Sequence, residues 1–332
     1  MTAMVPVWLA AIVCVGVMGF AIQRGATCTV AAVDEVLTQR SAHRLMALLE
    51  ASVWVAGGLA LAQLANLAGS MPAGHEVSAW TVIGGALLGL GAWVNRACVF
   101  GAVARLGSGE WAYAATPVGF YVGCLSVMPL FSRPVAGRLV PASPLFQVSA
   151  LVALLFVAFV LWRLRPGLQA LCGPDRVNGL RQKVWAPHAA TVVIGVCFVI
   201  TLLLVGRWAY TDVLADLARA MDLKSASGVV SLLPVVLLLA LYAGALIGGL
   251  TAGLWQSTRV SAAQLLRCFA GGVVMGWGSL LIPGSNDGLI LIGIPLLHPY
   301  AWLAFASMFA AIALAMQISR AHRLSRSNRK PP

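Results

Sequence analysis

Charged side chains are scarce in this sequence. Asp, Glu, Lys and Arg make up 10% of its 332 residues, whereas 60% are hydrophobic, and the mean hydropathy is +0.90. Soluble domains carry roughly 25% charged residues, so this composition excludes a soluble globular protein. A chain of this length can hold roughly nine or ten apolar spans of about 20 residues. We therefore expect an all-α polytopic membrane protein that forms a single membrane domain over residues 1–332.

Several motifs of soluble chemistry are also absent. The seven cysteines show no C-x-x-C spacing and no pairing with histidine, which argues against a zinc site or a disulfide framework. No G-x-x-x-x-G-K-[ST] loop occurs, so any use of ATP would need a partner chain. Haem, quinone and nucleotide motifs are missing as well. We expect no metal, no cofactor and no enzymatic activity.

Basic residues outnumber acidic ones, with 22 Lys and Arg against 10 Asp and Glu and a net charge of +12. They are scattered between apolar runs and form no patch with aromatic residues, which argues against nucleic acid as a partner. They are expected to be loop charges. The first apolar run, residues 5–22, lacks the positive segment of a cleaved signal peptide and is expected to remain as a span.

Glycine, by contrast, is abundant and repeats in register. The stretch 84–101 is echoed by the stretch 271–288, and Cys98 falls opposite Ser285. Five glycines recur at one offset, Gly84, Gly85, Gly89, Gly91 and Gly101 in the first copy and Gly271, Gly272, Gly276, Gly278 and Gly288 in the second. This agreement indicates an internal duplication.

Each copy predicts a helix with a smooth face for close packing, followed by a break. The breaks fall at residues 95–98 and 283–288, and a third lies at residues 23–29, before a short helical run to about Arg40. The polar stretch 207–227 holds the corresponding place in the second half. Irregular backbone inside a bilayer is tolerated only where it is buried in protein or lines a cavity. Paired broken helices therefore predict the binding site of a transporter.

Hydropathy predicts nine spans, at residues 5–22, 45–67, 79–94, 111–131, 146–162, 191–205, 229–255, 265–282 and 300–318. With a cytoplasmic C-terminus and a periplasmic N-terminus, 17 of the 22 Lys and Arg residues face the cytoplasm, as the positive-inside rule favours. The five outside are Arg133, Arg138, Arg207, Arg219 and Lys224. Four spans on each side of one linking span make the duplication an inverted repeat. We divide the chain into a first repeat (1–133), a linking span and cytoplasmic loop (134–187), a second repeat (188–318) and a basic, disordered cytoplasmic tail (319–332).

Three stretches carry a resemblance to a known family. They are G-F-A-I-Q-R-G-A-T-C-T at residues 19–29, the region of Cys98, and G-G-V-V-M-G-W-G at residues 271–278 with the P-G-S-N-D-G that follows. From about Gly16 to about Gln317 the chain resembles the YeeE/YedE family of bacterial sulfur-compound transporters. The resemblance implies thiosulfate import across the inner membrane and nine spans. It also implies re-entrant short helices that form an hourglass with three cysteines along its axis, and a small cytoplasmic sulfur-carrier protein as partner.

Cys28 and Cys98 match two of the three family cysteines, and Ser285 stands at the third, where the family has Gly-Cys-Thr. A thiol is a weak donor that can meet the soft sulfur of thiosulfate without holding it tightly, while helix N-termini suit its oxygens. The expected substrate-binding residues are Cys28, Cys98, Ser285, Thr29, Asn95, Arg24, Arg96, Asn286 and Asp287. The glycines at breaks and packing faces are Gly25, Gly91, Gly101, Gly278, Gly284 and Gly288.

Plainer explanations stand beside these. Packing as small hydrophobes accounts for Cys14, Cys124, Cys197 and Cys268, and Cys172 is expected in a loop. Anchoring by the positive-inside rule is the simpler role for Arg24 and Arg96, with an anion-attracting vestibule as the alternative. Asp287 has three possible roles, proton coupling, cation binding or capping of its short helix, and we favour capping. A membrane thiol-redox or sulfur-transfer protein, or a channel for another small anion, is the alternative function.

Overall fold

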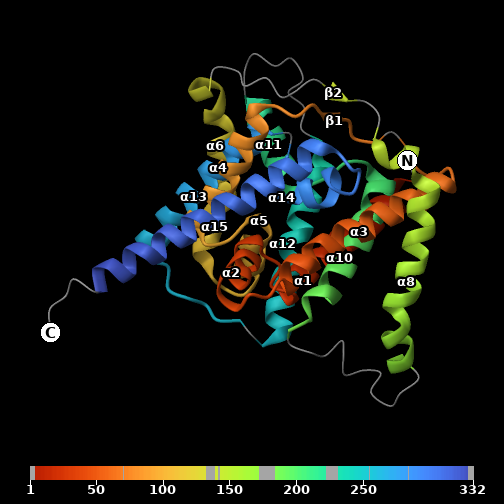
Figure 1. Cartoon of the computed structure of the whole chain (residues 1–332), viewed down its shortest axis with the longest axis horizontal. Coiled ribbons are helices and arrows are strands. Elements are labelled where there is room, and N and C mark those ends of the chain that lie inside the picture. The colour runs from red at the N-terminus through yellow and green to blue at the C-terminus, as the bar shows by residue number, and fades with distance from the viewer. Residues whose placement is uncertain are drawn as a thin grey trace.

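The computed structural model describes residues 4–69, 71–131, 139–140, 143–171, 184–221, 231–253, 255–282 and 284–327. These residues form a bundle of helices (Figure 1). Strands Gly74–His75 (β1) and Leu139–Val140 (β2) form one short antiparallel pair in this part of the chain. The prediction of an all-α polytopic membrane protein is confirmed.

Nine long helices occupy the positions of the nine predicted spans, counting the described residues only. They are α1 (Met4–Arg24), α3 (His43–Leu64), α4 (Ala79–Asn95), α6 (Ala115–Phe131), α8 (Ser149–Leu171), α10 (Pro187–Val205), α12 (Leu232–Ala252), α13 (Ala262–Leu281) and α15 (Pro299–Ser327). Within the same residues, six candidate spans are long and apolar enough to cross a membrane, and a seventh is added if α13 and the short helices after it count as one. Length and composition thus support six or seven spans, while helix positions match nine.

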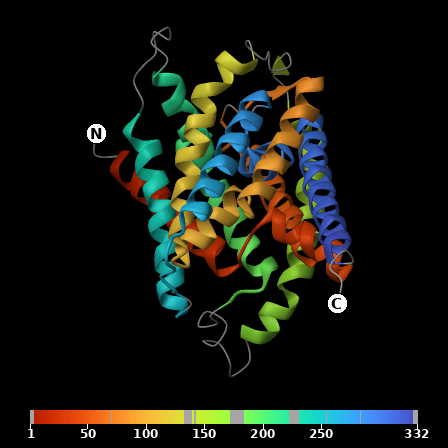
Figure 2. The same cartoon turned by 90° about the vertical axis from the view of Figure 1, so that its left-hand side faces the viewer.

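Short helices follow every predicted break. They are α2 (Thr29–Gln39), α5 (Val99–Gly107), and α14 (Asn286–Gly288) with the π-helical turn η2 (Leu289–Gly293). The polar stretch of the second half forms α11 (Tyr210–Met221). A 3₁₀ turn, η1 (Trp111–Ala114), leads into α6, and α7 (Pro144–Gln147) precedes α8. Figure 2 shows the short helices between the long ones.

The two copies of the glycine stretch lie against each other as a two-fold pair. A Cβ on Gly84 would lie 2.9 Å from the Gly278 carbonyl oxygen, and one on Gly91 would lie 2.7 Å from the Gly271 carbonyl oxygen. Because Gly271 and Gly278 are the repeats of Gly84 and Gly91, these are one contact made twice. Residue numbers fall along α13 as they rise along α4, so the helices are antiparallel and their two-fold axis is perpendicular to both. Such an axis relates inverted repeats.

Apart from α8, the other long helices pack in pairs that follow the same symmetry. Helix α4 packs on α15 as α13 packs on α6, and α1 packs on α12 as α10 packs on α3. A Cβ on Gly85 would collide with the backbone of α15, and one on its counterpart Gly272 with the backbone of α6. Small residues therefore let both pairs of helices approach closely. The residue boundaries of the repeats stay a prediction.

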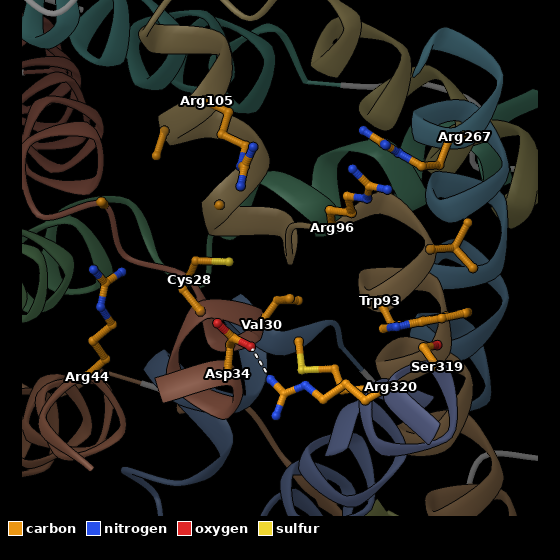
Figure 3. A pocket seen from close by; sticks show the side chains of 16 residues that line it. Cys28, Val30, Asp34, Arg44, Trp93, Arg96, Arg105, Arg267, Ser319 and Arg320 are labelled. Carbon is orange, nitrogen blue, oxygen red and sulfur yellow. Dashed lines mark hydrogen bonds and ion pairs between the residues drawn. The ribbon is translucent and has the colours of Figure 1, made fainter. Parts of the chain in front are cut away.

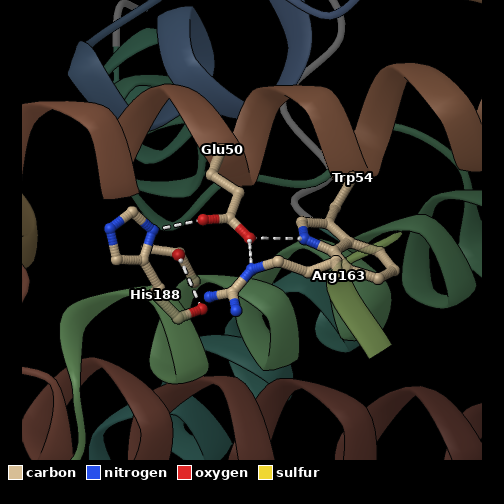
Figure 4. A network of polar contacts seen from close by, with 5 residues as sticks. Glu50, Trp54, Arg163 and His188 are labelled. Atoms are coloured by element: carbon tan, nitrogen blue, oxygen red, sulfur yellow. Dashed lines mark hydrogen bonds and ion pairs between the residues drawn. The ribbon is translucent and has the colours of Figure 1, made fainter. Parts of the chain in front are cut away.

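Helix α8 lies at the edge of the bundle, where it packs on α3 (Figure 1). A polar network joins the two helices to α10. The Glu50 carboxylate accepts hydrogen bonds from Arg163 Nε at 2.9 Å and Trp54 Nε1 at 3.3 Å, and it contacts His188 Nδ1 (Figure 4). Apolar side chains cover the outer face of α8, where lipid is expected. Helix α8 is thus joined to α3 and α10 through a carboxylate, both oxygens of which have partners.

The prediction of a disordered tail from residue 319 is wrong in its first part. Helix α15 continues to Ser327, because no glycine or proline interrupts residues 319–327. An ion pair of 2.7 Å between Arg320 and Asp34 of α2 also holds this end of the helix. Five predicted features lie outside the described residues, namely Arg133, Arg138, Cys172, Lys224 and the last five residues of the tail.

Candidate functional site

Three short helices begin at the three positions that the sequence singled out. Cys28 is the N-cap of α2, Cys98 the N-cap of α5 and Ser285 the N-cap of α14, each with extended backbone. The first backbone N–H groups of a helix have no partner within it and carry a partial positive charge. All three side chains therefore lie where a helix offers donors to an anion.

Each break contains a left-handed residue one or two positions before its N-cap. Ala26 has φ +45°, Arg96 φ +61° and Gly284 φ +119°. For Ala26 and Arg96 this conformation is sterically unfavourable, since neither is glycine. Backbone strain of this kind, about 1–3 kcal/mol per residue, persists only where the surrounding structure imposes it, and it clusters at functional sites.

The structure brings the Cys28 and Cys98 thiols together. Their side chains lie close enough to interact, and the Thr29 N–H donates to Cys98 Sγ at 3.2 Å. Neither cysteine is in a disulfide. Cys98 is fully buried, whereas Cys28 is partly exposed. Gly101 lies beneath the pair, because a Cβ there would be 2.5 Å from Cys28 Sγ.

The first residues of four short helices meet around these thiols. Asn286 Nδ2 of α14 donates to Thr29 Oγ1 of α2 at 3.4 Å, and Tyr210 Oη of α11 donates to the Val99 carbonyl of α5 at 2.9 Å. The sequence did not single out Tyr210 as a site residue. The only signal was that α11 holds the place of α2 in the second repeat.

Ser285 lies on the other side of this meeting point. Its side chain is 1% exposed, and its Oγ has no hydrogen-bond partner among the described residues. It lines a cavity of about 50 Å³ with Arg207, Thr211, Asp212 and Arg219. A buried hydroxyl without a partner costs about 1–3 kcal/mol, so this atom is suited to contact a ligand or water.

A much larger cavity, of about 800 Å³, opens on the Cys28 side (Figure 3). Its lining includes five arginines and one acid, Arg44, Arg96, Arg105, Arg267, Arg320 and Asp34. Cys28 lines this cavity, Ser285 lines the small one, and Cys98 is buried without lining either. The three N-cap residues thus differ in their access to these cavities.

The other predicted site residues have varied surroundings. Asn95 is occupied by the break itself, since its Nδ2 donates to the Ala97 carbonyl at 2.8 Å and its Oδ1 accepts from Thr116 at 3.1 Å. Arg24 donates to Thr251 Oγ1 at 2.8 Å and lines neither the large nor the small cavity. Arg96 lines the large cavity.

Asp287 makes a capping contact, but to a neighbouring short helix. Its carboxylate accepts from Thr211 Oγ1 at 2.6 Å and from the Thr211 N–H at 3.4 Å, in the first turn of α11. The residue is 2% exposed. The Asp287 carboxylate thus satisfies the Thr211 N–H and hydroxyl donors and joins α14 to α11.

The predicted glycines fall into three groups. Gly91 and Gly278 allow α4 and α13 to cross, and Gly25 and Gly101 face Ala190 and Cys28 with no room for a Cβ. Gly284 supplies a left-handed turn. A Cβ on Gly288 would meet no atom within 4 Å, so the structure gives this glycine no packing role.

The remaining described cysteines lie within helices. Cys14 contacts Cys197, Cys124 contacts Ser279 at 3.9 Å, and Cys268 is buried in an apolar cluster with Ala97. Across the described residues, no group of three or more His, Cys, Asp or Glu side chains is placed to hold a metal ion.

Cys28, Cys98 and Ser285, with the short helices that follow them, all fall within one family match. Residues 24–314 match the family model described as sulphur transport. The chain belongs to the sulphur transport family. It is also similar to the thiosulfate transporter TsuA of Escherichia coli (strain K12), with 25% identity over 339 aligned positions that cover 92% of each chain. The resemblance to the YeeE/YedE family is thereby confirmed.

Membership of the sulphur transport family fixes the broad function. The protein is a multi-pass membrane protein, and both its family and its relative are described by transport. Sulfur-anion transport is therefore the function class, and a small anion and membrane lipid are the partners that it implies.

Proposed function

We propose that this protein imports thiosulfate across the bacterial inner membrane, along a path through Cys28, Cys98 and Ser285. The observation that carries the proposal is that these three residues are N-caps of short helices, of which Cys28 lines the large cavity and Ser285 the small one. A similar transporter is named for thiosulfate.

The chemistry of the path suits a dianion with one soft and one hard end. The thiols of Cys28 and Cys98 are weak hydrogen-bonding groups that meet the terminal sulfur without trapping it. The oxygens meet backbone N–H groups at the helix N-termini. Ser285 Oγ, a stronger donor than a thiol, is free to meet an oxygen of the substrate. Weak successive contacts favour passage over retention.

Radiolabelled uptake into proteoliposomes tests this path. Cys28→Ala and Cys98→Ala should each lower thiosulfate uptake at least about tenfold, as loss of a partner in a poorly hydrated site predicts. Cys197→Ala, which removes a cysteine in α10 away from both cavities, is the matched control and should keep uptake. Sulfate, sulfite and selenite serve as competitors. Normal uptake by both path variants would refute the proposal.

The proposal includes an orientation, with the N-terminus in the periplasm and the C-terminus in the cytoplasm. The large cavity then faces the cytoplasm, where a small sulfur-carrier protein would receive the product. Impermeant thiol labelling tests the orientation with single cysteines at Ser327 and in the loop after β1. Val77 suits the loop better than Gly74, because Val77 is 51% exposed while Gly74 is buried against His298. Labelling of Ser327→Cys from outside the cell would overturn the assignment.

A second candidate function follows from the contact between the two thiols. In sulfur transfer, the Cys28 thiolate would attack the outer sulfur of thiosulfate, forming a cysteine persulfide and releasing sulfite. The proximity of Cys98 favours this chemistry, since it could accept the sulfur. Thiosulfate labelled separately on its two sulfurs separates the functions. Import of the intact anion delivers both labels equally, whereas sulfur transfer leaves the outer label on the protein.

A further inference from the structure

The large cavity holds more positive charge than its acids can balance. Three of its five arginines have acidic partners: Arg44 with Glu35 at 3.4 Å, Arg105 with Glu110 at 3.2 Å and Arg320 with Asp34 at 2.7 Å. The ion pairs among the described residues include neither Arg96 nor Arg267. These two guanidinium groups are the uncompensated charges of the cavity.

Arg96 and Arg267 reach the same space from different repeats. Arg96 ends α4, held by its left-handed backbone, and Arg267 projects from α13. Figure 3 shows both side chains extending into the cavity on the side opposite Arg44. Arg267 Nε is buried and has no hydrogen-bond partner among the described residues. Two cations that share one cavity repel each other. An anion between them offsets this repulsion and gives Arg267 Nε the hydrogen-bond partner that it lacks.

Among the residues that the structure describes, unpaired arginines line the cavity at Cys28 and not the one at Ser285. The repeat offset places Pro283 opposite Arg96 and Trp80 opposite Arg267, so neither cation has a counterpart in the other copy. The small cavity at Ser285 has two arginines, and each is paired with an aspartate, Arg207 with Asp212 and Arg219 with Asp216. The symmetry of the fold therefore does not explain why arginines stand at positions 96 and 267. A function at the cavity beside Cys28 does.

We propose that Arg96 and Arg267 form a second anion site, beyond Cys28 on the path, which binds the oxygen face of a small oxyanion such as thiosulfate or sulfate. This inference rests on the proposed function for the direction of the path, but not for the site itself. Guanidinium groups present planar forks of donors that match oxyanions and give no preference for a terminal sulfur. The arginine site therefore binds sulfate and thiosulfate alike, and selection falls to the cysteines.

Equilibrium binding to the purified full-length protein tests the site. Labelled sulfate and thiosulfate are measured at low salt with the unmodified protein and with Arg96→Gln, Arg267→Gln and Arg259→Gln. Arg259 is an exposed arginine in the loop before α13 that does not line the cavity, so it controls for loss of charge. We expect the Kd for both anions to rise roughly ten- to a hundredfold in the two cavity variants, the effect of removing a charged hydrogen bond, and to stay unchanged in the control.

Cys98→Ala separates this inference from the proposed function. The variant should lose thiosulfate uptake and keep sulfate binding at the arginine site. If neither Arg96→Gln nor Arg267→Gln changes sulfate binding, the inference is overturned, even where Cys98→Ala abolishes uptake. An acidic protein would then be the alternative occupant of the cavity. Normal uptake by Cys98→Ala with arginine-dependent sulfate binding overturns the path instead. If Arg267→Gln fails to fold, Arg267→Lys keeps the charge and should still weaken binding, because an ammonium cannot reproduce the fork.

Discussion

Gly101 and Gly288 occupy equivalent positions in the two repeats but have different surroundings, which makes them a matched pair for testing the thiol contact. A Cβ on Gly101 would be 2.5 Å from Cys28 Sγ, 3.0 Å from Cys28 Cβ and 3.1 Å from Ala97 Cβ. A Cβ on Gly288 would find no atom within 4 Å, and its φ of −63° is helical. The same added methyl group therefore clashes with Cys28 in the first repeat and enters open space in the second.

Gly101→Ala should displace Cys28 from Cys98. Carbon and sulfur cannot approach to 2.5 Å, so either Cys28 or α5 must shift, and overpacking of this kind costs about 1–3 kcal/mol. Gly288→Ala should be neutral or stabilise the protein by about 0.4–1 kcal/mol, because alanine restricts the unfolded chain. We expect thiosulfate uptake to fall at least about tenfold in Gly101→Ala, since even a misplacement of about 1 Å is costly where geometry matters, and to persist in Gly288→Ala.

Two readouts are needed to assign the cause. Thermal unfolding in detergent reports the stability change, and the rate at which a mild oxidant couples Cys28 to Cys98 reports their proximity. Gly101→Ala should slow that coupling while the protein remains folded and monodisperse. Uptake and coupling at the unmodified rates in Gly101→Ala would show that the close contact at Gly101 does not control the thiol pair.

Three further predictions concern other parts of the molecule. Ser285→Cys should preserve or raise thiosulfate uptake. Ser285→Ala should lower the affinity for thiosulfate roughly ten- to a hundredfold, because a buried donor is lost. Uptake that neither substitution changes would remove Ser285 from the path. Glu50→Gln should destabilise the protein by about 1–3 kcal/mol in thermal unfolding, because the amide lacks the charge that pairs with Arg163 and keeps only one acceptor oxygen for Arg163, Trp54 and His188. The exposed Glu76→Gln should not. Burial lowers the pKa of His298 below its ordinary value in the folded protein. The free energy of unfolding should therefore be highest above about pH 6.5, the unfolded value, and should decrease as the pH falls through the folded pKa. His298→Gln should flatten this pH dependence of the melting temperature.

The sequence was sufficient for the positions of the helices and breaks, for identifiable physical reasons. Apolar runs require helices in a bilayer, because every backbone group must be paired internally. The third break is marked by Gly284, which tolerates left-handed backbone, whereas the first two have Ala26 and Arg96 at that place and are indicated by the polar residues around them. The in-register glycines predicted the crossing of α4 and α13, since only small residues permit backbone contact.

The content of the site was harder to predict, because it depends on contacts across the fold. Tyr210 and Thr211 come from a helix whose sequence resembles an ordinary amphipathic surface, and only the fold places them beside Val99 and Asp287. Arg267 stands alone within an apolar helix and carries no local signal. The charge of residues 319–332 predicts a disordered tail, but no residue in 319–327 breaks a helix, so α15 continues to Ser327.

The departures from two-fold symmetry gather along the proposed path. The fold pairs α4 with α13 and α5 with α14, so an exact duplication would offer a substrate the same chemistry from both sides of the membrane. Instead Ser285 stands opposite Cys98, and the space beside Gly288 is open where Cys28 fills the space beside Gly101. Thiosulfate is itself unequal at its two ends. On the proposed path, a hydroxyl group lies on one side of the thiols and unpaired guanidinium groups lie on the other. Such a path distinguishes the two ends of thiosulfate at each step, which a symmetric path could not do.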